Sequence, residues 1–175
     1  MTSEYIFKKA EEMRRKCGSR NPYDLLDYIG AEVHFTQEFS PDGLKGYCTI
    51  IKRIKFAVIN AYLDEPEKRI VAGHEGAHLI LHTSEIYNSP VRALKDFHMF
   101  NETGIIEYQA NLFLADFLLS DEAVMETISE DNDFFSSARA LYVPPELLAF
   151  KQFSMNQRNF KVQSPLTPDG KFLAK

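Results

Sequence analysis

The chain has 175 residues, of which 45% are hydrophobic and 26% are charged, and its formal net charge is -5. This composition is ordinary for a folded globular protein and excludes a disordered or fibrous chain. The acidic balance also speaks against direct nucleic-acid binding, because nucleic-acid-binding domains usually carry a basic surplus. We expect one domain over 1–175, with N-terminal helices in 1–30, a central part in 31–120 and a helical C-terminal part with a tail in 121–175.

The sequence also indicates in which compartment of the cell the protein is expected. No stretch approaches the roughly 18 consecutive apolar residues of a membrane span. Residues 1–20 lack the apolar run and the cleavage site of a signal peptide. We therefore expect a cytoplasmic protein with no membrane partner. Cys17 and Cys48 belong to no metal-binding or redox pair, so we expect both to be reduced structural thiols.

The first part of the chain predicts two helices and a small sheet. Apolar residues recur at helical spacing over 3–16, and a second helix fits 22–29, where Gly30 ends it. A basic turn joins the last two of three strand-like stretches, which predicts a three-stranded antiparallel sheet. These stretches are 31–35, 46–51 and 55–60.

The rest of the chain is predominantly helical. Asp64 as N-cap, Pro66 in the first turn and Glu67 completing a capping box predict a helix over about 65–82. A helix over 102–119 is apolar on all sides and must lie in the middle of the fold. Further helices are expected over 121–128, over 133–141 and from Pro144 onward, before an irregular tail. The expected fold class is α+β, mostly helical, with the small sheet packed on helix 65–82.

Helix 65–82 carries His74-Glu75-Gly76-Ala77-His78, an H-E-x-x-H motif. Residues four apart lie on one face of a helix, so both imidazoles can share one metal ion, which makes them half of a zinc site. The alternative is a pair of packing histidines one turn apart. Apolar neighbours put this side of the helix in the core, where imidazoles without a ligand would each need a hydrogen-bond partner. We expect the glycines to let the helix lie close against its neighbours.

Zinc in a catalytic site takes three protein ligands, so the third one decides the class of site. Leu81 and Ser84 stand where a metzincin has a glycine and a histidine, which excludes that pattern. Glu107 is the leading candidate, because a carboxylate on the apolar helix 102–119 would be costly without a partner. The competing candidates are Glu102, His98 and Asp96.

Two further residues are expected beside the ligands. Asn111 stands one turn after Glu107, on the same face, where it can hydrogen-bond a ligand histidine and fix its orientation. His82 stands one turn after His78, and we expect it to pack beside the ligands without binding the metal.

Two segments resemble the ImmA/IrrE family of metallopeptidases: FAVINAYLDEPEKRIVAGHEGAHLILH and EYQANLFLADFLL. In that family a hydrophobic strand ending in Asn leads to a helix with HExxH-L-x-L-H, and a later helix carries E-x-x-A-N-x-F-x-x-x-x-L. The resemblance covers about 44–120. One departure is Gly76 followed by Ala77, where the family usually has a bulky residue and then Gly. The matching residues are Ile59, Asn60, Arg69, His74, Glu75, His78, Leu79, Leu81, His82, Glu107, Ala110, Asn111, Phe113 and Leu118.

The resemblance implies a zincin-like fold and a gluzincin-like site. His74, His78 and Glu107 would hold Zn²⁺, and Glu75 would act as general base in peptide-bond hydrolysis, which makes the protein a metallo-endopeptidase. By analogy, the substrate would lie along an edge strand, either 46–50 or 56–60. The oxyanion donor is left open among Tyr47, Tyr62, Tyr87 and His98.

The resemblance also implies a regulatory substrate. Members of the family typically act in bacteria, phages and mobile elements, where they cleave or inactivate a helix-turn-helix repressor. The chain has no basic or helix-turn-helix-like segment before its sheet, so that partner would be a separate protein. Two alternatives are a zinc-bound, non-proteolytic interaction module, such as a toxin-antitoxin component, and a helical scaffold without metal.

Overall fold

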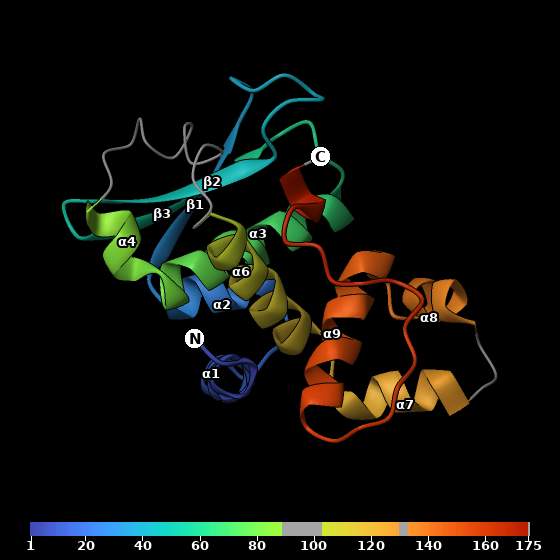
Figure 1. The fold of residues 1–175 in the computed structure, drawn as a ribbon. Helices are drawn as coiled ribbons and strands as arrows, with labels where there is room; N and C mark the ends of the chain where they lie inside the picture. Colours follow the sequence, from blue (N-terminus) through green and yellow to red (C-terminus); the bar gives the residue numbers. More distant parts are fainter. Residues whose placement is uncertain (89–102, 130–132, 175) are drawn as a thin grey trace.

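The computed structural model describes residues 1–88, 103–129 and 133–174. The three strands lie on one side of the molecule and helices α7 to α9 on the other, with α3 and α6 between them (Figure 1). The helices are α1 (Ser3–Cys17), α2 (Pro22–Tyr28), α3 (Glu65–Leu81), α4 (Thr83–Asn88), α6 (Thr103–Leu118), α7 (Asp121–Ser129), α8 (Phe134–Ala140), α9 (Pro145–Gln157) and the 3-10 turn η2 (Phe172–Ala174). The strands are β1 (Ala31–Thr36), β2 (Gly46–Ile51) and β3 (Ile54–Asn60).

The fold class expected from the sequence is confirmed. The chain is mostly helical, its sheet has three strands, and α3 packs on β2 and β3. On its other side α3 contacts α6, which also contacts α1 and α9. Among the described residues no helix is both long enough and apolar enough to cross a bilayer.

The antiparallel pairing predicted for all three strands is wrong for β1. The strand order is β1-β3-β2, and β1 pairs with β3 in parallel, from Ala31 opposite Lys55 to Thr36 opposite Asn60. Only β2 and β3 form the expected hairpin, through Lys52 and Arg53, which both have positive φ values. The sheet is therefore mixed, because the segment after β1 crosses to the far side of β3 instead of turning back on β1.

Asn60 holds this crossover segment in place. Its side chain is fully buried, and its Nδ2 donates to the backbone oxygens of Ser40 at 2.9 Å and Leu44 at 3.0 Å. Its Oδ1 accepts from the Tyr62 backbone N–H at 3.0 Å. One amide thus ties the end of β3 both to the segment that precedes β2 and to the chain that leads into α3.

Helix α3 begins as the sequence predicts, with Asp64 Oδ1 accepting from the Glu67 N–H at 2.8 Å. Every residue from Ile70 to Leu79 is buried, because the helix is covered by the sheet on one side and by α6 on the other. A Cβ at Gly73 would lie 2.4 Å from Leu114 Cδ1 and 3.2 Å from Pro22 Cγ. The expectation that a glycine allows close helix packing is confirmed at this position.

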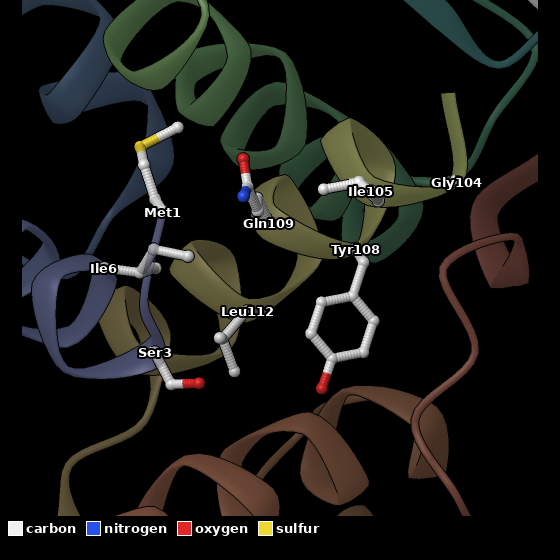
Figure 2. Close-up of a pocket in the computed structure, with 8 residues that line it drawn as sticks. All are labelled: Met1, Ser3, Ile6, Gly104, Ile105, Tyr108, Gln109 and Leu112. Carbon is white, nitrogen blue, oxygen red and sulfur yellow. The ribbon is translucent and has the colours of Figure 1, made fainter. Parts of the chain in front are cut away.

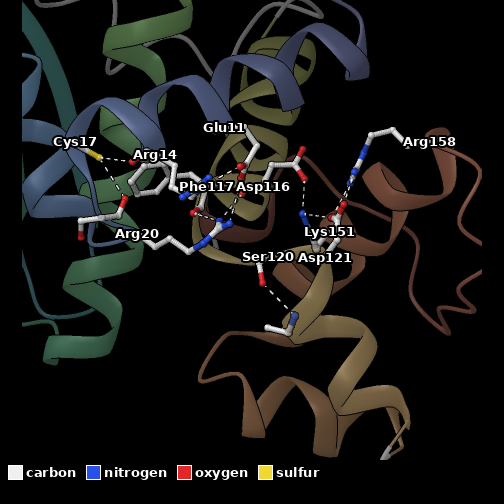
Figure 3. A network of polar contacts seen from close by, with 12 residues as sticks. Glu11, Arg14, Cys17, Arg20, Asp116, Phe117, Ser120, Asp121, Lys151 and Arg158 are labelled. Atoms are coloured by element: carbon white, nitrogen blue, oxygen red, sulfur yellow. Dashed lines mark hydrogen bonds and ion pairs between the residues drawn. The ribbon is translucent and has the colours of Figure 1, made fainter.

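A second buried feature ties α6 to α7 and α9 through charges (Figure 3). Lys151 Nζ lies 3.0 Å from Asp116 Oδ1 and 2.7 Å from Asp121 Oδ1. Ser154 Oγ donates to Asp116 Oδ2 at 2.7 Å, and Arg158 donates to both oxygens of Asp121. Burial opposes ionisation of Asp121, but hydrogen bonds from Arg158 and Lys151 outweigh it and lower the pKa of Asp121 to about 2. These acidic groups therefore have their own cations within the fold.

Gly73→Ala and Gly76→Ala form a matched pair, since each replaces a glycine of α3 by the best helix former. A methyl group at 73 meets tightly packed neighbours, whereas one at 76 meets Leu25 and Leu26 at an ordinary 3.4 Å. We expect the free energy of unfolding of Gly73→Ala to be about 1–3 kcal/mol below that of Gly76→Ala, as measured by urea denaturation. Equal stabilities would contradict the close packing at residue 73.

Lys151→Met should destabilise the fold by about 3–5 kcal/mol near pH 7, because it leaves Asp116 buried without its cation. Burial already raises the pKa of Asp116 although Lys151 and Ser154 favour its ionised form. In the variant the pKa of Asp116 in the folded state rises further above the unfolded value. The destabilisation should therefore shrink as the pH falls toward about 4, where the carboxyl group takes up a proton.

Lys16→Met is the control for this prediction, because Lys16 pairs with Glu12 on the exposed surface of α1. Its effect on the free energy of unfolding should be small at every pH. A Lys151→Met deficit that stays constant from pH 7 to pH 4 would show that Asp116 is not the group left unpaired.

Candidate metal centre

Two buried histidines from α3 and one partly exposed carboxylate from α6 meet where the two helices face each other. His74 Nε2 lies 3.0 Å from His78 Nε2 and 3.0 Å from Glu107 Oε2, and His78 Nε2 lies 3.3 Å from Glu107 Oε1. The helical spacing of the histidines places both rings on one face of α3, and the contact between α3 and α6 brings Glu107 opposite them. Among the described residues this is the group of histidine and acidic side chains that is placed to hold a metal ion.

The outer nitrogen of each histidine is hydrogen-bonded. His74 Nδ1 lies 2.8 Å from Asn111 Oδ1, and since that oxygen can only accept, His74 carries its proton on Nδ1. His82 Nε2 likewise donates to Gln109 Oε1 at 3.0 Å, which leaves His82 Nδ1 as an acceptor for the Nδ1–H of His78 at 3.2 Å. In both ligand candidates the Nε2 lone pair therefore points to the shared centre, as metal-binding histidines require.

The donor set fits a divalent transition metal. Two imidazole nitrogens and an ionised carboxylate that converge within 3.3 Å repel one another unless a metal ion lies between them or protons on the imidazoles bridge them. Zinc bonds of about 2.0–2.1 Å in a tetrahedron correspond to ligand separations of about 3.3 Å, close to those observed. Nitrogen and oxygen ligands of this kind suit zinc and its first-row neighbours. The cluster is thus compatible with a metal ion.

The charges of the cluster depend on one another. Burial opposes ionisation of Glu107, but hydrogen bonds with His74 and His78 outweigh it and hold the pKa of Glu107 well below its usual range. Burial also opposes the charged form of His74, yet the Glu107 carboxylate leaves the pKa of His74 raised. Both shifts have one cause, the short contacts between the Glu107 carboxylate and the imidazole nitrogens, which favour protonated imidazoles when no metal is bound.

Glu75 lies beside the cluster on the side of the sheet. It is buried, and burial, reinforced by the negative charge of Glu107, raises the pKa of Glu75, whereas the two ligand histidines act in the opposite direction. The thiol of Cys48 on β2 hydrogen-bonds Glu75, and burial together with that carboxylate raises the pKa of Cys48 well above its usual value. The thiol therefore stays protonated, and it is the donor in the hydrogen bond to the Glu75 carboxylate.

Sequence reasoning missed this contact. Cys48 is a free, buried thiol, as expected, but its position beside Glu75 was not foreseen. The available signal was the alternation of β2, which puts Gly46 and Cys48 on the same face. A Cβ at Gly46 would lie 2.5 Å from Val71 Cγ1 and 3.6 Å from Glu75 Oε1, so a glycine there lets β2 approach α3 closely.

Gln109, the partner of His82, was also missed, because a glutamine on an apolar helix gives no specific signal. It lines a cavity of about 290 Å³ between the start of α1 and α6, together with Met1, Ile6, Tyr108 and others (Figure 2). None of the ligand candidates lines this cavity. Gln109 thus contacts His82 and also lines this cavity.

The remaining candidates are placed as follows. The alternative third ligands Glu102, His98 and Asp96 lie outside the described residues. Tyr62 and Tyr87, two of the candidate oxyanion donors, are more than half exposed, at 53% and 59%. The ring of Tyr47 packs edge-on against Phe39.

Similarity to known proteins identifies the family of this chain. The profile of the IrrE N-terminal-like domain, a peptidase family, matches residues 27–151, which include both helices of the centre. The chain belongs to this family. It is also 30% identical over 155 residues to "Uncharacterized immunity region protein 2" of Bacillus phage phi105, across 86% of this chain and 92% of that protein.

Membership of a peptidase family supports a metallopeptidase-type function. The matched region begins before the sheet and ends within α9, so the resemblance found over about 44–120 extends further in both directions. The family match and the cluster of His74, His78 and Glu107 agree in pointing to a metal-dependent site.

We expect the purified protein to bind one divalent transition-metal ion per chain, and Glu107→Gln to weaken that binding strongly. An amide retains the shape of the carboxylate but loses the charge that balances the metal. Metal analysis after dialysis against a chelator measures the effect. Glu85→Gln, at an exposed glutamate of α4, is the control. If Glu107→Gln retained its metal as tightly as the control, Glu107 would not be a ligand.

Proposed function

We propose that the protein is a zinc-dependent endopeptidase in which His74, His78 and Glu107 hold Zn²⁺ and Glu75 is the general base. The observation that carries the proposal is the convergence of two Nε2 lone pairs and one carboxylate beside a buried glutamate of raised pKa. Three protein ligands leave a coordination position for water, which is the pattern of catalytic zinc rather than structural zinc.

The charge balance of the core supports a bound cation. Asp116 and Asp121 are neutralised by Lys151 and Arg158. Within the described residues no lysine or arginine forms an ion pair with Glu75 or Glu107, whose nearest positive partners are imidazoles. A divalent ion would supply the missing charge.

When bound, zinc would activate a water molecule and polarise the carbonyl group that the water attacks. The raised pKa of Glu75 makes its carboxylate a stronger base, so Glu75 would accept the proton of the attacking water near neutral pH. The same proton would then pass to the leaving amine nitrogen. The Cys48 thiol, by donating to Glu75, would restrict how that carboxylate can turn.

The topology narrows the choice of substrate-binding strand. The alternative of 56–60 as an edge is wrong, because β3 is paired on both sides. Strand β2 is an edge, and in the part of the chain that the structure describes no further strand pairs with it. Since Gly46 of β2 lies beside Glu75, we infer that an extended peptide adds to this edge and reaches the centre.

We infer that the substrate is a helix-turn-helix repressor, as the family resemblance implies. The name of the phage phi105 relative assigns that protein to an immunity region, which supports a regulatory partner. The net charge of -5 agrees with a protein partner rather than DNA. The proposal retains the cytoplasmic location expected from the sequence.

Glu75→Gln tests the general base. Incubated with the repressor encoded beside its gene, the wild-type protein should cleave it. Glu75→Gln should retain zinc but cleave at least about 100-fold more slowly, because the amide cannot take up the proton. Mass spectrometry of the repressor measures the rate, and Glu146→Gln, at the start of α9, is the control.

Equal cleavage by the wild type and Glu75→Gln would exclude Glu75 as the base. Tight binding of the repressor with no cleavage by either protein would favour the alternative of a zinc-bound interaction module. Wild-type protein that binds no metal would favour a helical scaffold.

A further inference from the structure

A segment far along the chain reaches the metal centre from the side of α6. Residues 169–173, named here the docking segment, lie on the first turns of α6, near the end of the chain marked C in Figure 1. A Cβ at Gly170 would lie 3.0 Å from the Gly104 oxygen and 3.3 Å from the Tyr108 nitrogen, so backbone meets backbone there. Gly104 and Tyr108 stand on either side of Glu107 in the sequence.

Aromatic packing anchors the docking segment. The ring of Phe172 lies 6.1 Å from that of Phe150, and Leu173 packs beside it on the core between α1, α3, α6 and α9. The Phe172 N–H donates to the Asp169 backbone oxygen at 3.3 Å, and the Lys171 N–H donates to Asp169 Oδ1 at 3.0 Å. These contacts give the Gly170 carbonyl a defined direction.

The Gly170 carbonyl accepts from Asn111 Nδ2 at 3.0 Å, and Asn111 Oδ1 accepts from His74 Nδ1 at 2.8 Å. Asn111 is fully buried, so its amide sits between these two partners and away from water. A carbonyl oxygen can only accept, which forces the NH₂ group of Asn111 toward Gly170 and its oxygen toward His74.

The other orientation of the amide would satisfy His74 equally well. A rotated Asn111 would offer its NH₂ group to His74 Nδ1 and favour the tautomer that carries its proton on Nε2. That tautomer has no lone pair at the centre and cannot bind a metal. The hydrogen bond to the Gly170 carbonyl is therefore what favours the observed orientation of the Asn111 amide over the rotated one.

We propose that the docking segment is a positioning element of the metal centre, which fixes the tautomer of His74 by orienting Asn111 through the Gly170 carbonyl. The proposal rests on the proposed function for the role of His74 as a ligand. The second histidine does not depend on this segment, because His78 is oriented through His82 and Gln109. Loss of the docking segment should thus weaken metal binding without removing any ligand.

Gly170→Val tests the proposal, since its side chain would push the docking segment off the backbone of α6. In competition with a chelator, the full chain carrying this substitution should bind zinc at least about 10-fold more weakly than the wild type. Lys161→Ala, at an exposed position outside the docking segment, should leave the affinity unchanged. Phe172→Ala loosens the anchor without a steric clash, and it replaces Gly170→Val if that variant does not fold.

The Asn111→Asp background separates orientation from general loosening. A carboxylate has two equivalent acceptor oxygens, so it accepts from His74 Nδ1–H in either orientation. In this background Gly170→Val should cause no further loss of zinc affinity. The proposal would be overturned if Gly170→Val lowered the zinc affinity by the same factor in both backgrounds. It would also be overturned if Gly170→Val caused no loss of zinc affinity when Asn111 is present.

A spectroscopic measurement tests the inference apart from the proposed function. Nitrogen NMR of the metal-free protein, recorded at a pH above the raised pKa of His74, reports which ring nitrogen of His74 carries the proton. The wild type should show the Nδ1–H form, and Gly170→Val should show a substantial Nε2–H population. An unchanged tautomer in the variant would overturn the inference even if zinc binds. If the wild type bound no zinc but Gly170→Val still shifted the tautomer of His74, the proposed function would be wrong and the inference about Gly170 would stand.

Discussion

The close approach of α3 and α6 is the constraint on which the rest of the structure depends. Gly73 lets the two helices meet at Leu114, and His74 is the next residue along α3. The separations of 3.0 and 3.3 Å between the histidine nitrogens and the Glu107 carboxylate exist because the two backbones are this near. A helix spacing larger by a methyl group would keep every ligand candidate and lose their convergence, so packing and chemistry cannot be varied independently here.

Two clusters of charged side chains lie along α6, and they differ in which groups balance their negative charge. Around Asp116 the chain supplies its own lysine and arginine, and the result is a cross-link between α6, α7 and α9. Around Glu107 the described side chains supply imidazoles, whose Nε2 lone pairs face inward. The first cluster is complete as a structural element, whereas the second is compatible with a metal ion that would balance the charge of Glu107. The family match over 27–151 agrees with this division.

Sequence reasoning placed side chains correctly where the signal was a short-range spacing or a charged group in an apolar segment. The spacing of His74 and His78 fixes their common face, and an isolated glutamate on an apolar helix implies a partner, which led to Glu107. The parallel pairing of β1 was missed because a crossover leaves no periodic pattern, and only Asn60 marks it. The contacts of Cys48 with Glu75 and of Gly170 with Asn111 were missed because each joins segments far apart in the sequence.

Asn111 and Gly170 are separated by 59 positions along the chain, which has a consequence for the order of events during translation. A nascent chain acquires both histidines, Glu107 and Asn111 well before the ribosome adds residue 170. Until then, on the positioning role proposed above, the Asn111 amide would lack the carbonyl that sets its direction, and the tautomer of His74 would not be fixed. The site would then mature only after all of its ligand candidates have been synthesised.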